Sequence, residues 1–225
     1  MFEYHVLTIG RFSRNRFWGE LESRAYRDAL CTSTLIKGKM NMVADPSLPP
    51  DQMAKTLYDR SGLRPDAVAA VFITHAHGDH YAGLELFEHA RWFMSGIDLA
   101  AMRKSDNPRS RELAGKIQPF EPGALDGLEF VPLPGHTAGS AGLLFQSEDG
   151  RVMVAGDAVM TRDFFRHRAA YYNAADKEQN RDSIVRIAET ADIVVPGHGN
   201  YFIARNISST ALPSASGSST PSSLA

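Results

Sequence analysis

Cysteine is almost absent from this sequence, and so are long apolar runs and any excess of charge. The single cysteine, Cys31, cannot form an internal disulfide, so the chain has no disulfide framework and suits the cytosol. A formal net charge of −2 gives no electrostatic reason to expect nucleic acid as the main partner. The apolar run 67–73 is too short to span a bilayer, and the first residues lack the basic and long apolar regions of a signal peptide. We therefore expect a soluble, cytoplasmic protein that does not enter the membrane.

What the chain does have is enough apolar sequence for one sizeable core. At 225 residues and 43% hydrophobic composition it predicts one domain, which we assign to residues 1–206. Residues 207–225 change to a stretch that is rich in Ser, Thr, Pro and Ala and has no charge. Such a composition does not favour a packed core, so we expect a disordered tail.

Short apolar and β-branched segments alternate with turns and with helical patterns. Strands are expected at residues 4–9, 30–36, 40–44, 68–73, 129–133, 142–146, 152–155 and 193–195, and helices at 51–61, 81–88 and 175–191. This order, strands followed by a helix and a further strand, occurs twice. It predicts two sheets that pack face to face, with helices on the outside.

Metal-binding side chains are concentrated in one loop. The stretch VFITHAHGDHYAGL, residues 71–84, places His75, His77, Asp79 and His80 directly after an apolar segment typical of a strand buried on both faces. Metal ligation needs lone-pair donors that rigid elements hold at about 2.0–2.2 Å from the ion. A single histidine there would be more simply a hydrogen-bonded structural residue, but this set together indicates a metal site.

Three later strand ends each carry a further donor beside a glycine. They are His136 in LPGHTAGS, Asp157 in VAGDAV and His198 in VPGHGN. Each follows an apolar segment, so all three are expected at one rim of a sheet if the strands align. Five of the eight histidines of the chain occupy this loop and these strand ends, which random placement would rarely produce.

The complete pattern resembles the metallo-β-lactamase superfamily, over about residues 1–206. The resemblance implies an α/β (α+β) fold, the αββα sandwich in which helices flank two mixed β-sheets. It also implies a binuclear metal site like that of glyoxalase II. In that site the first metal would be bound by His75, His77 and His136, the second by Asp79, His80 and His198, and the two would be bridged by Asp157.

The donor set favours hydrolytic chemistry. Imidazole and carboxylate ligands without a thiolate suit two Zn²⁺ ions, while Fe and Mn are also compatible. Two divalent ions a few ångströms apart lower the pKa of a bridging water to give hydroxide at neutral pH, and they polarise the carbonyl or phosphoryl group under attack. Asp79 is the candidate catalytic residue, because it could orient that hydroxide and pass its proton to the leaving group.

Departures from other branches of the superfamily narrow the function. The chain ends soon after His198, without the helical domain with which glyoxalase II enzymes bind glutathione, and Met160 stands where acyl-homoserine lactonases usually have a tyrosine. The chain is similar to the compact branch typified by metallo-β-lactamase domain-containing protein 1, of which at least one member is associated with RNA cleavage.

The resulting prediction is a binuclear metal-dependent hydrolase of an ester, thioester, lactone or amide of a small metabolite. The alternative is a phosphodiesterase or ribonuclease of the same fold. A non-catalytic, metal-stabilised binding protein is a third hypothesis from a different class, and the intact donor set argues against it. We expect a small-molecule substrate rather than nucleic acid, and a monomer or homodimer.

An arginine-rich segment near the N-terminus is a first candidate for substrate binding. Residues 10–27 carry five arginines against two glutamates and interleave them with aromatic side chains, including Phe17 and Trp18. The segment could form a flap beside the metals or a dimer contact. The simpler interpretation is a solvated surface loop.

A second candidate segment follows Asp157. Residues 161–172 offer Arg162, Arg166 and Arg168. A guanidinium can bind a carboxylate or phosphate through two parallel hydrogen bonds, so these side chains could recognise an anionic group of the substrate. The simpler interpretation is the charged face of a helix.

Overall fold

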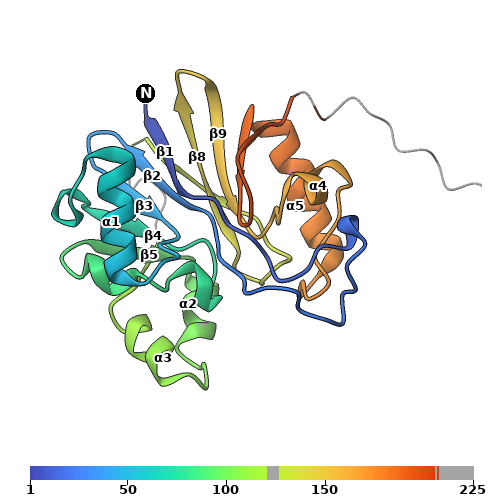
Figure 1. Cartoon of the computed structure of the whole chain (residues 1–225), viewed down its shortest axis with the longest axis horizontal. Coiled ribbons are helices and arrows are strands. Elements are labelled where there is room, and N and C mark those ends of the chain that lie inside the picture. Colours follow the sequence, from blue (N-terminus) through green and yellow to red (C-terminus); the bar gives the residue numbers. More distant parts are fainter. Residues whose placement is uncertain (121–126, 206, 208–225) are drawn as a thin grey trace, which may run out of the picture.

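Two β-sheets lie face to face, and helices cover their outer faces (Figure 1). The computed structural model describes residues 1–120, 127–205 and 207. The arrangement confirms the αββα sandwich that the sequence predicts. Of the tail expected at 207–225, only Ile207 falls within the described residues. Among those residues, no helix has the length and apolar character needed to cross a membrane.

The first sheet contains six strands from the N-terminal half of the chain. In spatial order they are β1 (Glu3–Thr8), β2 (Ser33–Lys37), β3 (Met42–Ala44), β4 (Ala70–Phe72), β5 (Arg91–Met94) and β6 (Gln118–Pro119). The pairs β1–β2 and β2–β3 are antiparallel, whereas β3 to β6 run parallel. The ends of β3 and β4 therefore lie at the same edge of this sheet.

The second sheet contains five strands from the C-terminal half. In spatial order they are β11 (Phe202–Ile203), β10 (Ile193–Pro196), β9 (Gly150–Gly156), β8 (Ala141–Ser147) and β7 (Glu129–Pro132). Only β9 and β10 pair in parallel, because a helix connects them in a crossover. The ends of β9 and β10 therefore also lie at one edge.

Two longer helices cover the outer faces of the sheets (Figure 1). Helix α1 (Pro50–Ser61) lies on the first sheet and ends at Gly62, which adopts the left-handed conformation with φ of 72°. Helix α5 (Lys177–Thr190) lies on the second sheet. It is capped at its N-terminus by Asp176, whose side chain accepts hydrogen bonds from two backbone N–H groups of the first turn.

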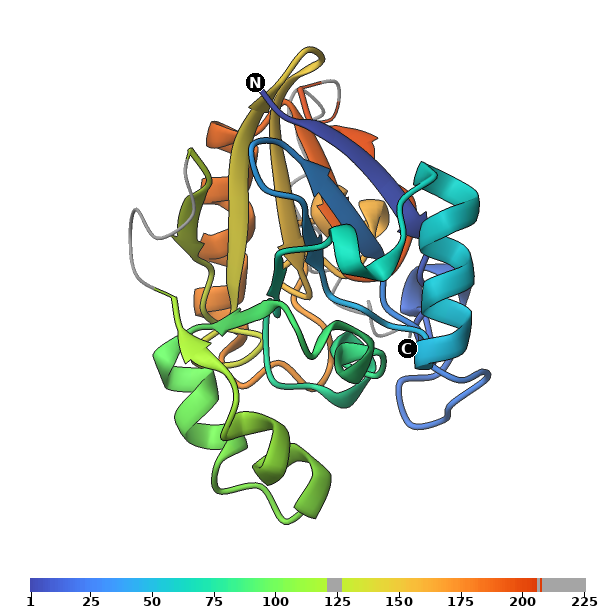
Figure 2. The same ribbon diagram turned by 90° about the vertical axis from the view of Figure 1, so that its left-hand side faces the viewer.

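Shorter helices gather at one end of the sandwich. Helices α2 (Gly96–Met102) and α3 (Pro108–Ala114) lie together there, and the loop 10–30 reaches the same end (Figures 1 and 2). Helix α4 (Arg162–Arg166) follows β9, and 3-10 turns are formed at Arg16–Trp18, Pro65–Ala67, Gly78–His80 and Leu84–Phe87.

Successive side chains of a strand point to opposite faces of its sheet. The buried apolar side chains of the two sheets therefore form three layers. In β2, Leu35 packs in the layer that contains Leu57 of α1, while Ile36 packs between the two sheets. In β9, Val154 joins the layer between the sheets and Met153 joins the layer under α5. The order helix, sheet, sheet, helix therefore follows from a period-two pattern of buried side chains.

The expected strands and the two longer helices are present, with ends that shift by a few residues. The α-helix predicted at 81–88 is wrong. This segment forms only the 3-10 turn Leu84–Phe87, and another 3-10 turn, Gly78–His80, precedes it. Strand β5 and helices α2 and α3 are missing from the prediction. They have four, seven and seven residues, too few for a clear hydrophobic period.

Replacing Leu57 tests the packing of α1. Leu57→Ala should lower the free energy of unfolding by about 2–5 kcal/mol, because Leu57 is fully buried between α1 and the first sheet. The neighbouring Tyr58 is 60% exposed, so Tyr58→Ala is the matched control and should change it by no more than about 0.5 kcal/mol. Urea unfolding followed by circular dichroism measures both. Equal effects of the two substitutions would contradict the described orientation of α1.

Candidate metal centre

The predicted donor residues lie at strand ends along one edge of the sandwich. His75 follows β4, Asp157 follows β9 directly, and His198 follows β10, while His136 lies in the loop between β7 and β8. In the second sheet, parallel pairing brings the ends of β9 and β10 to one edge, and antiparallel pairing places the loop between β7 and β8 at the same edge. Donors far apart in the sequence therefore meet in one place.

The seven predicted ligands form two groups. One group contains His75, His77, His136 and Asp157, and the other contains Asp79, His80 and His198; within each group the donor atoms lie within 4.8 Å of one another. Asp157, for which the family resemblance implies a bridging position, is grouped with the first set. A third group, which overlaps the second, places Cys31 and Asp45 beside His80. These His and Asp clusters are able to hold divalent metal ions.

Asp157 lies between the two groups with one carboxylate oxygen facing each. Its Oδ2 is 3.3 Å from Nε2 of His136 and 3.7 Å from Nε2 of His75. Its Oδ1 is 3.3 Å from Nε2 of both His80 and His198. The side chain is only 5% exposed. This orientation gives each group one oxygen of a shared carboxylate.

Hydrogen bonds outside the cluster orient two of the imidazoles. Nδ1 of His198 lies 2.9 Å from the carbonyl oxygen of Leu30 and 3.1 Å from that of Arg11. Both partners can only accept, so Nδ1 carries a proton and Nε2 is the nitrogen that faces the cluster. Nδ1 of His80 lies 2.9 Å from Oδ2 of Asp45, which directs its Nε2 into the cluster in the same way.

Asp45 is a site residue that the sequence analysis misses. It is 1% exposed. Besides holding His80, its carboxylate accepts hydrogen bonds from the N–H and the hydroxyl of Thr74, both at 2.8 Å. A signal was present, since Asp45 directly follows β3 just as the predicted donors follow other strands. However, an Asp-Pro pair such as Asp45-Pro46 is typical of an ordinary turn, so the aspartate does not stand out in the sequence.

Burial keeps two rings of the first group neutral. It lowers the pKa of His75 well below its ordinary value and lowers that of His136 to about 4. Burial alone would raise the pKa of Asp157, but the surrounding imidazoles outweigh it and hold that pKa well below the usual range. His75 and His136 therefore present neutral rings beside an ionised carboxylate at neutral pH.

The second group behaves in the opposite way. Burial alone would lower the pKa of His80 and of His198, but nearby negative charge outweighs it and raises both. Asp157 supplies this charge to both rings, and Asp45 adds to it at His80. Cys31 does not contribute a charge at neutral pH, because burial raises the pKa of its thiol to about 12. Without metal, His80 and His198 therefore hold protons beside Asp157.

Three buried polar atoms of the predicted ligands make no hydrogen bond. One is Nδ1 of His136, and the other two are Oδ1 of Asp157 and Nε2 of His80, which face each other at 3.3 Å. Buried polar atoms without a partner are costly and therefore uncommon in native proteins. A divalent cation between Asp157 and His80 would satisfy the last two atoms, so the donor set fits a metal ion.

Gly197 allows the backbone to approach the shared carboxylate. A Cβ atom at this position would lie 1.9 Å from Oδ1 of Asp157, so only glycine fits. The N–H of Gly197 also donates to the carbonyl oxygen of Gly156 at 2.9 Å. The glycine beside the predicted ligand His198 therefore ties the ends of β9 and β10 together around Asp157.

A cavity of about 220 Å³, called here the central cavity, opens over the cluster. The residues that line it are Phe12, Ser13, Ala29, His77, Asp79, His136, Asp157, Met160, Tyr171, Tyr172, Asn173 and His198. None of these described lining residues is Lys or Arg. Asp79 has a side chain that is 26% exposed, compared with 5% for Asp157, so it is the carboxylate more open to a substrate.

The residues predicted for substrate binding do not line the central cavity. Arg166 and Arg168 are exposed at the end of α4 and just beyond it. Phe17 packs against Phe164, with ring centroids 4.9 Å apart, and stacks on His167 at 4.5 Å. The structure thus brings the seven predicted metal ligands together but leaves these three side chains on the surface or within local packing.

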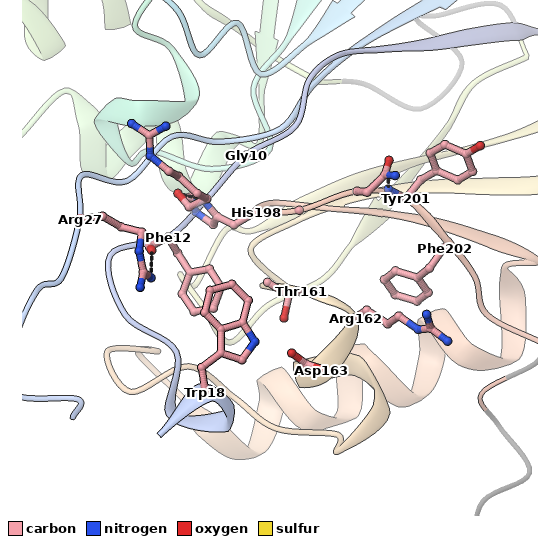
Figure 3. Close-up of a pocket in the computed structure, with 13 residues that line it drawn as sticks. Gly10, Phe12, Trp18, Arg27, Thr161, Arg162, Asp163, His198, Tyr201 and Phe202 are labelled. Atoms are coloured by element: carbon pink, nitrogen blue, oxygen red, sulfur yellow. Dashed lines mark hydrogen bonds between the residues drawn. The ribbon is translucent and has the colours of Figure 1, made fainter. Parts of the chain in front are cut away.

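Trp18 and Arg162 line a neighbouring cavity of about 420 Å³, which shares Phe12 and His198 with the central cavity (Figure 3). The ring of Trp18 lies beside that of Phe12, whereas Arg162 extends toward Phe202 and away from them. Trp18 is 62% exposed. These two side chains therefore lie near the centre but outside the space directly over it.

A further cavity of about 440 Å³, called here the α2 cavity, borders the cluster on the side of α2. It shares His77, His136 and Asn173 with the central cavity. Its wall combines apolar side chains, including Ile97 and Met102 of α2, with polar ones such as Ser105. The space over the cluster therefore continues into a second, less polar space.

Comparison with known proteins identifies the family. Residues 26–198 match the sequence profile described as the metallo-beta-lactamase superfamily. This chain belongs to the metallo-β-lactamase superfamily. It is therefore a metal-dependent hydrolase, and its His and Asp clusters are the part of the molecule that can hold the metal.

Individual relatives agree with this assignment. The chain is 32% identical over 175 residues to metallo-β-lactamase domain-containing protein 1 of Xenopus laevis, which covers 75% of this chain and 70% of the relative. It is 24% identical over 189 residues to an N-acyl homoserine lactonase of a Bacillus species. This alignment covers 80% of this chain and 74% of the relative. A Thermotoga maritima structure, described as a metallo-β-lactamase candidate, superposes with a TM-score of 0.68 at 19% identity and covers 90% of this chain and 99% of that one.

The pKa shifts predict that zinc stabilises the protein more strongly as the pH rises. Protons on His80 and His198 stabilise the metal-free fold below the ordinary histidine pKa of 6.5, and this contribution is lost as the pH rises through their raised folded-state values. Zinc must displace the same protons, so low pH opposes its binding. The increase in melting temperature caused by zinc, relative to protein in EDTA, should grow from about pH 6 to about pH 8. A zinc effect that does not vary with pH would contradict these two shifts.

Proposed function

We propose that the protein binds two Zn²⁺ ions and hydrolyses a carboxylic ester, lactone, thioester or amide of a small metabolite. The observation that carries the proposal is the position of Asp157, whose two oxygens face separate groups of imidazoles. A carboxylate shared in this way supports a two-metal centre. Imidazole and carboxylate donors favour zinc.

Different residues of the chain would bind the two metals and transfer the proton. The first metal would be held by His75, His77 and His136, the second by Asp79, His80 and His198, and both by Asp157. Bound zinc would lower the pKa of the attacking water into the neutral range and polarise the carbonyl oxygen. Asp79, which borders the central cavity, would accept the proton of that water on its carboxylate and return it to the leaving group.

The central cavity supports an uncharged carbonyl substrate over a phosphodiester. Its wall beside the cluster contains the rings of Phe12, Tyr171 and Tyr172 and the side chain of Met160, and none of its described residues is Lys or Arg. Sites that bind phosphate usually supply cationic side chains. The α2 cavity provides room for an aliphatic arm of the substrate. The sequence similarity to an N-acyl homoserine lactonase agrees with a lactone among the substrates.

A side-by-side hydrolysis panel tests this proposal. On zinc-loaded protein, kcat/KM for carboxyl esters or lactones should exceed that for bis(p-nitrophenyl) phosphate by at least about 100-fold, which corresponds to about 2.7 kcal/mol. Elemental analysis should give close to two zinc ions per chain. Preference for the phosphodiester would favour the ribonuclease alternative, and a protein that takes up no zinc would rule out the proposal.

Asp157→Asn tests the shared carboxylate. The amide cannot offer a charged oxygen to each group, so we expect at most one bound zinc and a loss of kcat of at least about 100-fold, or about 2.7 kcal/mol. Elemental analysis and kinetics on the same preparation measure both quantities. Two zinc ions and unchanged turnover in this variant would remove Asp157 from the centre.

A pair of substitutions tests where the substrate binds. Tyr172 lines the central cavity, so Tyr172→Ala should raise KM for ester substrates by about tenfold, or 1.4 kcal/mol, with zinc content unchanged. Arg166 is exposed and outside that cavity, so Arg166→Ala is the matched control and should leave KM unchanged. A higher KM for anionic substrates in Arg166→Ala alone would support the anion-binding hypothesis drawn from the sequence.

A further inference from the structure

A buried carboxylate connects the two loops that carry His77 and His136. Asp98, in the first turn of α2, is 2% exposed. Its Oδ2 accepts hydrogen bonds from the N–H of Ala76 at 2.9 Å and from the hydroxyl of Thr137 at 2.8 Å. Its Oδ1 accepts from the N–H of Gly139 at 2.8 Å. Three donors from two separate loops therefore stabilise one buried charge.

Each loop presents a predicted metal ligand next to its bond with Asp98. Ala76 directly precedes His77, and Thr137 directly follows His136. Because both loops donate to the same oxygen, they cannot separate without breaking one of these bonds. The two ligand rings meet with Nδ1 of His77 at 2.9 Å from Nε2 of His136. Asp98 therefore fixes the distance between these donors.

The loop after His136 is shaped to reach this carboxylate. A Cβ atom at Gly139 would lie 2.5 Å from both Oδ1 and the backbone N of Asp98, so only glycine permits the approach. The hydroxyl of Thr137 also lies 2.7 Å from Oγ of Ser140. The polar groups of the loop therefore bond to Asp98 and to one another.

The contacts require an aspartate and not its amide. All three partners of the carboxylate donate, so asparagine would turn its NH₂ group toward at least one donor and leave that donor unpaired. A buried carboxylate is costly unless it is fully hydrogen-bonded. Helix capping does not account for it, because Ser95 already caps α2 by accepting from the N–H of Asp98 at 3.2 Å.

We propose that Asp98 is a positioning residue that sets the metal affinity of the first group, His75, His77 and His136, separately from that of the second. The second group has its own buried carboxylate, since Asp45 holds Nδ1 of His80 at 2.9 Å. The proposal rests on the two-metal centre of the proposed function but on no particular substrate.

Stepwise zinc titration of the full-length, metal-free protein against a competing chelator tests the proposal. Asp98→Asn should weaken one of the two binding steps by about 10- to 100-fold and leave the other nearly unchanged. Asp106→Asn is the matched control, because Asp106 is exposed in the loop between α2 and α3, and it should change neither step. Wild-type affinity at both steps, or an equal loss at both, would overturn the proposal.

Double variants assign the affected step to a group. With His136→Ala, which already breaks the first group, Asp98→Asn should have no further effect on the remaining zinc. With His198→Ala, which breaks the second group, Asp98→Asn should still weaken the remaining zinc by about 10- to 100-fold. The reverse result would overturn the assignment of Asp98 to the first group. The melting temperature of each variant in EDTA separates this effect from a general loss of stability.

Milder variants cover the case in which Asp98→Asn does not fold. Thr137 is only partly buried, and Thr137→Val removes one of the donors to Asp98, whereas Thr137→Ser keeps it. Zinc binding at the first group should weaken with Val and recover with Ser; wild-type affinity in the Val variant would overturn the proposal. If the wild-type protein takes up only one zinc, the two-metal function is wrong instead, and the affinity of that zinc in the Thr137 or Asp98 variant still decides whether Asp98 acts on it.

Discussion

The charge of Asp157 within a set of buried imidazoles is the interaction on which the rest of the site depends. A carboxylate that is 5% exposed would be strongly unfavourable without positive charge beside it. Protons on His80 and His198 supply that charge in the metal-free protein, and divalent cations fit the same positions. The buried charge of Asp157 can thus be neutralised by protonated imidazoles or by bound cations. Protons and metal ions therefore compete for the same nitrogen atoms of His80 and His198.

The site also joins the two sheets. His75, His77 and His80 follow a strand of the first sheet, while His136, Asp157 and His198 follow strands of the second. Metal ions held between them would connect the two layers at this edge. Most of the stability lies elsewhere, in the apolar layers between the sheets and under α1 and α5. The fold can therefore tolerate a polar, charged edge because its core is built independently.

The sequence predicts those features that depend on local pattern. The spacing of donors in residues 75–80, and the single donors at His136 and Asp157, could be read because ligands follow strands that have clear apolar patterns. Asp98 could not, because its importance comes only from the loops that pack against it. The cavity wall is similar: Tyr172, at the end of the segment 161–172, lines the central cavity, although no ligand pattern in the sequence marks it. The arginines that follow Asp157 in the chain, Arg162, Arg166 and Arg168, are exposed on α4 and just beyond it.

The hydrogen bonds of His198 have a consequence for how the centre assembles. The carbonyl groups that orient this ring belong to Leu30 and Arg11, which are 168 and 187 positions away in the chain. During synthesis, the N-terminal segment that contains Arg11 and Leu30 is complete long before His198 emerges. The hydrogen bonds between these carbonyl groups and the His198 ring can therefore form only late in folding. The second group of donors can form only when the two ends of the domain have met. A metal ion held there is therefore a sign that the whole domain, and not merely one half of the sandwich, has reached its native arrangement.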